Sequence, residues 1–433
     1  MKTLLDIIAR HKAGDSRGIY SVCSAHPLVI EAAMRRAQRQ SSSVLIEATS
    51  NQVNQDGGYT GMRPADFARF VREIAARVGL PPARVLLGGD HLGPNCWQHL
   101  DAEDAMRRSE QLLADYVAAG FRKLHLDCSM SCGGDPAQLG DELVAARAAR
   151  LCRVAEAAWQ RAGGEAPVYV VGTEVPVPGG AQESLAELRP TAAAAAVATI
   201  EAHANAFAAA GLTATWPRVI ALVVQPGVEF DHHHVIDFLP QRASALSAVI
   251  AAQPSMVYEA HSTDYQTAAA LSALVRAHFA ILKVGPGLTF ALREALWALA
   301  QIETEWLPLA ERSNLREKVL AAMQDDPRHW KKYYHESGAQ LLLDQQYSLS
   351  DRLRYYWNVP PVERALAKLL DNLESKPPPL TLLSQYMPQQ YAAVRAGNLP
   401  NSAREHVLHH IDLVLQQYAT ACNGARDGGG PRD

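Results

Sequence analysis

The chain places an acid and an imidazole side by side, Asp90 and His91, within the segment VLLGGDHLGPN. Other short apolar runs also end in polar side chains. These are Glu47 in VLIEATS, Asp127 in KLHLDCSM, Glu174 in VYVVGTEVP, Gln225 in VIALVVQPG, Glu259 and His261 in MVYEAHST, and Lys283 in AILKVGP. Because a buried charge is costly unless it is paired or bound to a metal, this repetition predicts a single functional site.

The acids of this set must be compensated if they meet. Two like charges about 5 Å apart repel by roughly 3 kcal/mol at an effective dielectric of 20. Lys283 is the only evident cation at the ends of these runs. Protons, hydrogen-bond donors or a divalent metal must supply the rest, and imidazole with carboxylate suits Zn²⁺ or Mn²⁺. The alternative for the acids is that they are spread around the rim and solvated. The alternative for the adjacent pair is that Asp90 is a helix N-cap and His91 is hydrogen-bonded.

A phosphate site is predicted after the last of these runs, in KVGPGLTFALREAL. Gly285 and Gly287 precede a helix there, and backbone N–H groups at a helix start bind anions. Ser262, Thr263 and Lys283 are expected to assist. The alternative is that Gly-Pro-Gly is simply a turn.

Eight β-rich runs alternate with helix-like stretches rich in Ala, Leu, Arg and Glu. The runs begin at Gly18, Val44, Val85, Lys123, Val168, Arg218, Met256 and Ala280. Near-continuous apolar strands that alternate with helices predict a parallel sheet, and eight units predict a (β/α)8 TIM barrel. Such barrels carry their chemistry at the carboxyl ends of the strands, where the polar residues lie. An open doubly wound sheet is the alternative, but it normally shows a Gly-rich turn after the first strand, and SAHPLVIEAA has none.

Side-chain parity refines this expectation, because successive strand residues point to opposite faces. His125 and Asp127 therefore share a face, as do Glu259 and His261. The segment GTEVPVPGG, residues 172–180, is too rich in Pro and Gly for a helix and is interpreted as an ordered loop over the barrel mouth, or as a plain connection.

The alternation stops near residue 300, and the rest of the chain is predicted to be helical. We expect a barrel over 1–300, a helical C-terminal region packed on it over 301–422, and a disordered tail over 423–433. Two aromatic and basic segments, 330–334 and 352–357, are interpreted as packing or a subunit contact, with a sugar-phosphate clamp as the alternative.

Composition excludes several classes of protein. The 433 residues are 48% hydrophobic and 20% charged with a formal net charge of -4, which gives no electrostatic case for binding nucleic acid or an acidic membrane. Charges interrupt the N-terminal segment, so no signal peptide is expected. Six cysteines are few for this length, which favours free thiols and a cytoplasmic location.

Long motifs identify a family resemblance. They include VLIEATSNQVNQDGGYTGM, GGDHLGPNCWQ, HLDCSMSCGGDP, GTEVPVPGG, VVQPGVEFDH, YEAHSTDYQT, LKVGPGLTFALREA and YSLSDRLRYYW. The chain resembles the Z-type subunit of class II D-tagatose-1,6-bisphosphate aldolase over nearly its whole length. The resemblance implies a barrel, a place in galactitol or N-acetylgalactosamine catabolism, and a role in the activity and stability of a catalytic Y-type subunit. Relatives are also described as epimerases that convert D-tagatose 6-phosphate into D-fructose 6-phosphate at carbon 4.

The residues and the resemblance together give a site hypothesis, in which the barrel mouth binds a phosphorylated ketohexose and a divalent metal, Zn or Mn. The bond between carbons 3 and 4 would open and re-form by a retro-aldol route. The predicted roles are acid–base for Asp90 and Glu259, metal ligand for His91, Glu174 and His261, and substrate binding for Glu47, Asp127, Gln225, Ser262, Lys283, Gly285 and Gly287.

Three functions are compared on this basis. The first is an accessory aldolase subunit in a homo- or hetero-oligomer, and the second is an autonomous metal-dependent epimerase. A sugar-phosphate kinase is the third, and it has no GxxxxGK[ST] motif behind it. No nucleotide cofactor is expected.

Overall fold

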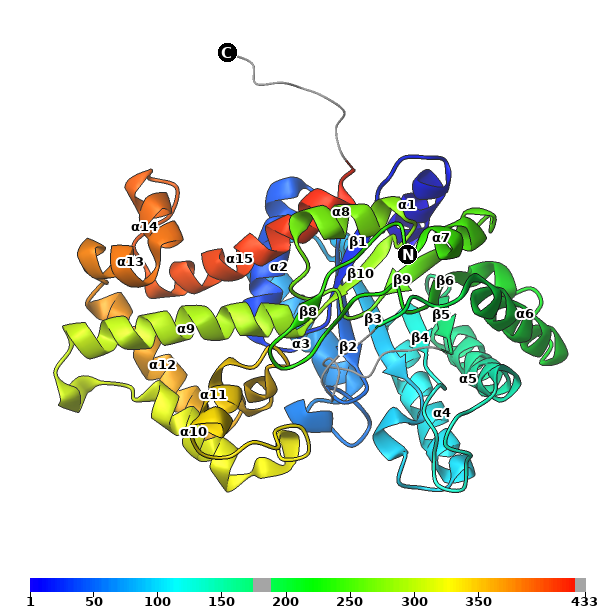
Figure 1. Cartoon of the computed structure of the whole chain (residues 1–433), viewed down its shortest axis with the longest axis horizontal. Coiled ribbons are helices and arrows are strands. Elements are labelled where there is room, and N and C mark those ends of the chain that lie inside the picture. The colour runs from blue at the N-terminus through cyan, green and yellow to red at the C-terminus, as the bar shows by residue number, and fades with distance from the viewer. Residues whose placement is uncertain (174–187, 425–433) are drawn as a thin grey trace, which may run out of the picture.

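Eight parallel strands close into a barrel in the computed structural model, which describes residues 1–173 and 188–424 (Figure 1). Each strand pairs with its neighbours around the ring in the order β1-β10-β9-β6-β5-β4-β3-β2. The strands are β1 (Ile19–Val22), β2 (Val44–Thr49), β3 (Val85–Leu92), β4 (Lys123–Leu126), β5 (Val168–Gly172), β6 (Val219–Val223), β9 (Val257–Ala260) and β10 (Ile281–Val284). All eight predicted runs form these strands, and the predicted (β/α)8 barrel is confirmed.

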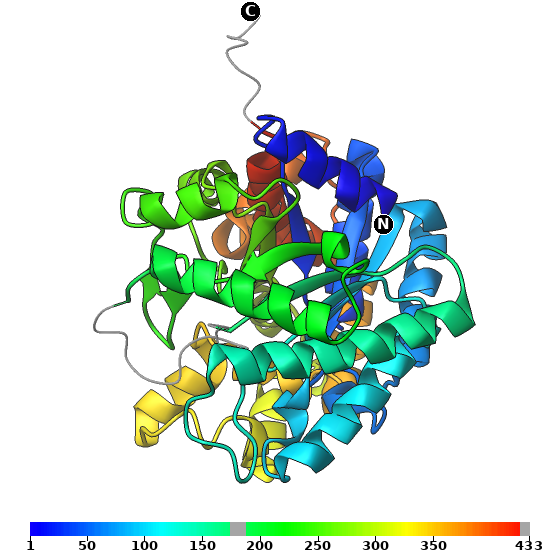
Figure 2. The same cartoon turned by 90° about the vertical axis from the view of Figure 1, so that its right-hand side faces the viewer.

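Helices cover the outside of the barrel, because each strand is followed by an amphipathic or Ala-rich segment with one apolar face. Figure 2 shows three of them, α4, α5 and α6, side by side. The surrounding helices are α2 (Pro27–Gln40), α3 (Pro64–Val78), α4 (Ala102–Ala119), α5 (Asp141–Ala162), α6 (Ala193–Ala209), α7 (Ser244–Ala251), α8 (Ala268–Arg276) and α9 (Pro286–Trp306). A short antiparallel hairpin, β7 (Glu229–Phe230) with β8 (Val235–Ile236), follows β6.

The barrel interior has an apolar floor and a charged upper part. Leu45, Val257 and Ile281 belong to the floor. The N-terminal helix α1 (Lys2–Lys12) closes this end of the barrel, opposite the mouth, with Leu4 and Ile8. Two residues further along these three strands, on the same face, stand Glu47, Glu259 and Lys283. The strands therefore change from apolar to charged towards their carboxyl ends.

The C-terminal region packs on the barrel. Its helices are α10 (Leu315–Asp325), α11 (Gly338–Tyr347), α12 (Pro360–Ser375), α13 (Leu380–Tyr386), α14 (Pro388–Arg395) and α15 (Ala403–Cys422). The last of these, red in Figure 1, lies against α2, α8 and α9. Tyr418 on α15 donates from Oη to the Thr263 carbonyl oxygen at 2.7 Å, close to the barrel mouth.

Part of this region reaches over the mouth. Tyr265 Oη donates to the carbonyl oxygen of Leu349 at 2.5 Å, and Asn358 Nδ2 donates to that of Tyr59 at 2.8 Å. The short helix η7 (Arg352–Tyr356) lies between these two contacts in the sequence. The predicted helical extension is confirmed, while the division at residue 300 stays a prediction, and α9 runs through that position.

No described helix combines the length and the apolarity needed to cross a bilayer. All six cysteines are free thiols. The tail predicted to be disordered lies, from residue 425, outside the described residues.

Candidate active site

A buried lysine forms the base of the charged layer. Lys123, at the start of β4, is fully buried, and its Nζ lies 2.6 Å from Glu47 Oε1 and 2.5 Å from Glu259 Oε2. The two acids come from β2 and β9, on other parts of the ring. Gly88 on β3 makes room for this arrangement, since a Cβ there would lie 2.4 Å from Glu47 Oε1. The sequence expectation considered cations only at the ends of the apolar runs, so it overlooked Lys123 at the start of β4 as a partner for two of the acids.

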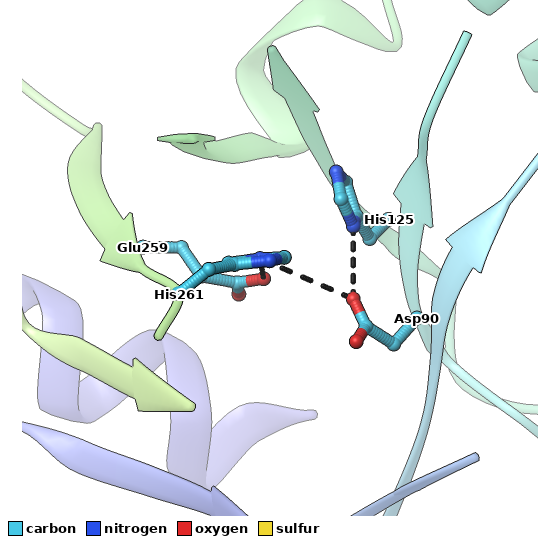
Figure 3. Close-up of side chains that lie close together, drawn as sticks. All are labelled: Asp90, His125, Glu259 and His261. Carbon is cyan, nitrogen blue, oxygen red and sulfur yellow. Dashed lines mark hydrogen bonds and ion pairs between the residues drawn. The ribbon is translucent and has the colours of Figure 1, made fainter. Parts of the chain in front are cut away.

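Four side chains with metal-ligand chemistry converge above this layer. One ligand atom from each of Asp90, His125, Glu259 and His261 lies within 4.8 Å of the others, and all four residues are buried. Figure 3 shows Asp90 between the two imidazoles, with Glu259 beside the ring of His261. The His125 Nδ1 to Asp90 Oδ1 distance is 2.9 Å and the His261 Nε2 to Glu259 Oε1 distance is 3.1 Å. We call these four residues the acid–histidine cluster.

A bulge in β3 lets both Asp90 and His91 turn inward. The pairing of β3 with β4 shifts register between Gly89 and Leu92, and His91 has a φ of 48°. A positive φ is uncommon for a residue with a side chain and is often found at functional sites. As a result His91 is buried with its ring centroid 5.1 Å from that of His261.

His91 is held from behind by Asp127. His91 Nδ1 lies 2.7 Å from Asp127 Oδ2, and Asp127 Oδ1 accepts from the Ser129 backbone N–H at 3.1 Å and from its Oγ at 2.6 Å. Both oxygens of Asp127 are therefore engaged, and this residue, predicted to bind substrate, orients a histidine.

The cluster holds its carboxylates ionised. Burial alone would raise the pKa of Asp90, but the neighbouring His91 and Lys283 outweigh it and hold that pKa well below its usual range. Glu259 follows the same pattern, with burial overcome by Lys123 and Lys283. Burial lowers the pKa of His261 to about 4, so this imidazole is neutral near pH 7 and free to ligate a metal.

Lys283 stays protonated in the same surroundings. Burial opposes its charge, but Asp90 and other anionic neighbours raise its pKa well above the usual value. Its Nζ is 3.0 Å from Asp90 Oδ1 and also contacts Glu47. A lysine held as ammonium cannot attack a carbonyl, so its position suits charge compensation.

The site opens into a cavity that we call the inner cavity. Six of the predicted site residues line it: Asp90, His91, His261, Ser262, Lys283 and Gly285. Glu47 and Glu259 lie beneath, fully buried. Arg354 and Tyr355 of η7 also line it, so the C-terminal region contributes to the site.

The remaining predicted residues are placed elsewhere or engaged. Gln225 does not line the inner cavity, and its Oε1 accepts from the backbone N–H groups of Gly227 and Val228 at 2.8 and 3.0 Å. Glu174, and the 172–180 loop from that residue on, lie outside the described residues.

The predicted phosphate cradle already has an acceptor. The amides of Gly285 and Gly287 both donate to Asp264 Oδ1, at 2.9 and 2.8 Å. A phosphate at these amides would have to displace this buried carboxylate.

Sequence reasoning missed three residues of the site. Lys123 and His125 were not chosen, although both share strand parity with Asp127 in KLHLDCS and that parity could have found them. Arg354 lies far along the chain, in a segment interpreted as packing or a subunit contact with a sugar-phosphate clamp as the alternative, and it was not chosen as a site residue.

Comparison with known proteins places the chain in a family. The family described as D-tagatose-1,6-bisphosphate aldolase subunit GatZ/KbaZ-like matches residues 4–423. The chain belongs to this family. The resemblance drawn from the motifs is therefore confirmed.

Similar solved structures include a relative that matches nearly the whole chain. A protein from Sinorhizobium meliloti 1021, described as a probable tagatose 6 phosphate kinase, is 51% identical with a TM-score of 0.86, covering 94% of this chain and 100% of its own. The fructuronate-tagaturonate epimerase UxaE from Cohnella laeviribosi is 14% identical with a TM-score of 0.48, covering 93% of this chain and 82% of its own. The YdjI aldolase from Escherichia coli K12 is 11% identical with a TM-score of 0.40, covering 83% and 93%. The last two similarities are too weak to carry an argument about activity.

Proposed function

We propose that this GatZ/KbaZ-like chain is itself an enzyme, a divalent-metal-dependent epimerase that converts D-tagatose 6-phosphate into D-fructose 6-phosphate by inverting carbon 4. The acid–histidine cluster carries the proposal, because it joins four buried ligand-type side chains from β3, β4 and the β9 end of one barrel. A protein that only supports a partner has no need of this cluster, since buried charge costs stability unless it is well paired.

His125, His261 and Glu259 are the proposed metal ligands, with His91 and Glu174 of the sequence prediction as further candidates. Two imidazoles and a carboxylate suit Zn²⁺ or Mn²⁺. When bound, the metal would supply Lewis-acid stabilisation of negative charge on the substrate oxygens. Glu259, predicted as an acid–base group, is assigned here as a ligand because it lies beneath the inner cavity and does not line it.

Asp90 is the proposed proton-transfer group, because its carboxylate lines the inner cavity in which the sugar would bind. It would take the proton of the carbon 4 hydroxyl while the bond between carbons 3 and 4 breaks. The bonding electrons pass into an enediolate on carbons 2 and 3, and carbon 4 becomes an aldehyde. The aldehyde turns its other face, carbon 3 attacks it, and Asp90 returns the proton. No oxidant or co-substrate is consumed.

The test uses the purified chain without a partner subunit. Incubated with D-tagatose 6-phosphate and Zn²⁺ or Mn²⁺, it should form D-fructose 6-phosphate, and a chelator should stop the reaction. In deuterated water the product should carry no deuterium at carbon 4, because the retro-aldol route never breaks that C–H bond. Absence of turnover with every metal would refute the epimerase, and deuterium at carbon 4 would refute the route.

Variants assign the roles. Asp90→Asn should lower kcat by a factor of about 10² to 10⁴, as expected for loss of a general base. His261→Ala should also lower the metal bound per chain, measured by mass spectrometry. Glu303→Gln is the matched control, since Glu303 is a buried carboxylate that accepts from Ser313 on the outside of the barrel. Equal losses in all three variants would point to a general folding defect and contradict these roles.

The second candidate is an accessory role in a class II D-tagatose-1,6-bisphosphate aldolase, and the family description as an aldolase subunit favours it. In that role the chain would bind a Y-type catalytic subunit in the cytoplasm, in galactitol or N-acetylgalactosamine catabolism. The chain should then copurify with that subunit and prolong its activity. A subunit equally active and durable alone would refute this role, which is compatible with the first.

A kinase activity is the third candidate, and only the description of the Sinorhizobium protein favours it. Consumption of ATP in the presence of D-tagatose 6-phosphate would support it. The sequence contains no GxxxxGK[ST] motif that would cradle the phosphates of ATP.

A further inference from the structure

A second cavity, of about 790 Å³, lies outside the inner one. We call it the outer cavity. It is formed by the segments that follow β2 and β3, such as Asn51 and Asn95, and by the C-terminal region, including Arg352. It shares Asn51, Tyr59 and Tyr355 with the inner cavity, so the two adjoin.

Arg352 is a buried cation that forms no salt bridge with an acid among the described residues, although Asp351 precedes it in the chain. It is 2% exposed, and its Nε and Nη2 atoms have no hydrogen-bond partner among the described residues. Its guanidinium stacks on Tyr333 at 3.3 Å from the ring centroid, and Nη1 makes a weak contact of 3.4 Å with Tyr355 Oη. The stacking offsets part of the desolvation cost of the charge, but it provides no hydrogen-bond acceptor for Nε or Nη2.

Asn95, which also lines this cavity, carries a second buried donor. Its Oδ1 accepts from Gln98 Nε2 at 2.9 Å, which orients the amide. Its Nδ2 is buried and has no acceptor among the described residues. Native proteins rarely leave such donors unpaired, so two of them on residues that line one cavity indicate an acceptor-rich ligand.

The charge of the cavity fits an anion. Lys332 and Arg328 also line it, and Asp326, the only acid among its described lining residues, is paired with Arg328 at 2.7 Å. Arg352 and Lys332 therefore leave an excess of positive charge. A phosphate monoester supplies both the negative charge and several acceptor oxygens that the guanidinium fork and the amide require.

An unpaired buried arginine is not by itself a binding site, and this protein contains a second example. Arg293 on α9 is 4% exposed, stacks on Phe290 at 4.0 Å, and also has Nε and Nη2 without partners among the described residues. Neither cavity includes it. The difference for Arg352 is the adjoining space, the second orphan donor and the surplus of cations.

We propose that the outer cavity binds the phosphate group of the sugar phosphate, held by Arg352 and Asn95 with Lys332 at its edge. The carbon skeleton would then extend past Tyr59 and Tyr355 into the inner cavity. The proposal rests on the proposed function for the identity of the sugar but not for the phosphate site itself. It also provides a holder for the phosphate other than the amides engaged by Asp264.

Calorimetry with inorganic phosphate, using the full-length chain, tests the site without any turnover. Arg352→Met should weaken phosphate binding by about tenfold to a hundredfold, the usual loss for a hydrogen-bonded charge pair, and Arg352→Lys should fall between. Arg293→Met is the matched control and should bind phosphate within about twofold of the parent chain. Equal affinity in Arg352→Met and the parent would overturn the proposal.

A second variant guards against loss of folding in Arg352→Met. Asn95→Asp replaces the amide NH2 of a partly exposed side chain with a carboxylate oxygen. It places a negative charge at the site, so it should weaken phosphate binding at least as much as Asn95→Ala. Unchanged binding in Asn95→Asp would also overturn the proposal.

Different ligands identify the occupant. D-tagatose 6-phosphate should bind more tightly than inorganic phosphate, and its affinity should fall in Arg352→Met, while unphosphorylated D-tagatose should be insensitive to this change. ATP bound more tightly than the sugar phosphate through Arg352 would overturn the assignment to a sugar phosphate. Binding that depends on Arg352 without any epimerisation would retain the site and refute only the epimerase.

Discussion

Lys123 sits at the centre of the charge balance inside the barrel, in contact with Glu47 and Glu259 and with no exposed surface. Removal of one member of a buried ion pair leaves an uncompensated charge, which costs far more than the pair contributes. The lysine therefore holds in place the two carboxylates that lie beneath the inner cavity, Glu47 and Glu259.

Lys123→Met is expected to destabilise the protein by about 3–5 kcal/mol, because it strands two carboxylates away from water. Guanidinium denaturation followed by circular dichroism measures this loss. Combining Lys123→Met with Glu47→Gln should recover part of it, since one stranded charge is removed. A double variant as unstable as the sum of the two single variants would contradict the coupling.

Asp264 offers a pH-dependent test of the adjoining loop. Burial raises the pKa of Asp264 to about 6 from its usual 3.8, despite the two amides from which it accepts hydrogen bonds. The folded state therefore holds this proton more tightly than the unfolded chain, so the group lowers stability as pH rises from about 4 to 6. Above pH 6 the penalty reaches about 3 kcal/mol at most, at 1.36 kcal/mol per pH unit.

Asp264→Asn keeps an Oδ1 acceptor for both amides and removes the charge. The variant should be more stable than the parent at pH 8 and nearly equal to it at pH 4, as measured by urea denaturation at both values. A stability difference that does not change with pH would show that the carboxyl does not titrate in this range.

At the scale of elements, α1 closes the bottom of the barrel and supports the site from below. Leu4 is fully buried on the floor formed by Leu45, Val257 and Ile281, whereas its neighbour Leu5 is 41% exposed. Because both leucines lie on the same helix, comparing their substitutions separates the effect of burial on stability from the effect of helix propensity.

Leu4→Ala should cost about 2–5 kcal/mol, the range for a leucine removed from a packed core. Leu5→Ala should change stability by no more than about 0.5 kcal/mol. Thermal unfolding of the two variants makes the comparison, and similar losses in both would mean that α1 is not a packed part of the barrel.

The bulge in β3 is the element that sequence alternation alone does not predict. Period-two parity sends adjacent residues to opposite faces, yet Asp90 and His91 both turn towards the site because the register shifts there. The bulge depends on pairing with β4, a contact with a strand more than thirty residues away, so no local pattern signals it.

At the scale of the whole molecule, the C-terminal region is part of the barrel's structure and of its mouth. Helix α15 buries four large side chains: Leu408, Ile411, Leu415 and Tyr418. It contacts α2, α8 and α9 of the barrel. Removing α15 would expose this apolar surface of the barrel to water.

A chain that ends at residue 402 should therefore fail to fold into a protease-resistant barrel and should bind the dye ANS. A chain that ends at residue 424 should resist trypsin as the full chain does. A stable, compact product ending at residue 402 would instead show that the barrel folds without α15.

The sequence by itself determined the eight strands, the parallel barrel and the family, because these depend on short-range alternation of apolar and polar residues and on long motifs. It also named Asp90, Glu259 and His261, since strand-end position shows in the pattern. Only the tertiary structure decided which charges meet: Lys123 between Glu47 and Glu259, His125 beside Asp90, and Arg352 over a cavity at the mouth. Closure of the barrel and the return of the C-terminal region create these contacts, and residues so far apart in the chain leave no shared local signal.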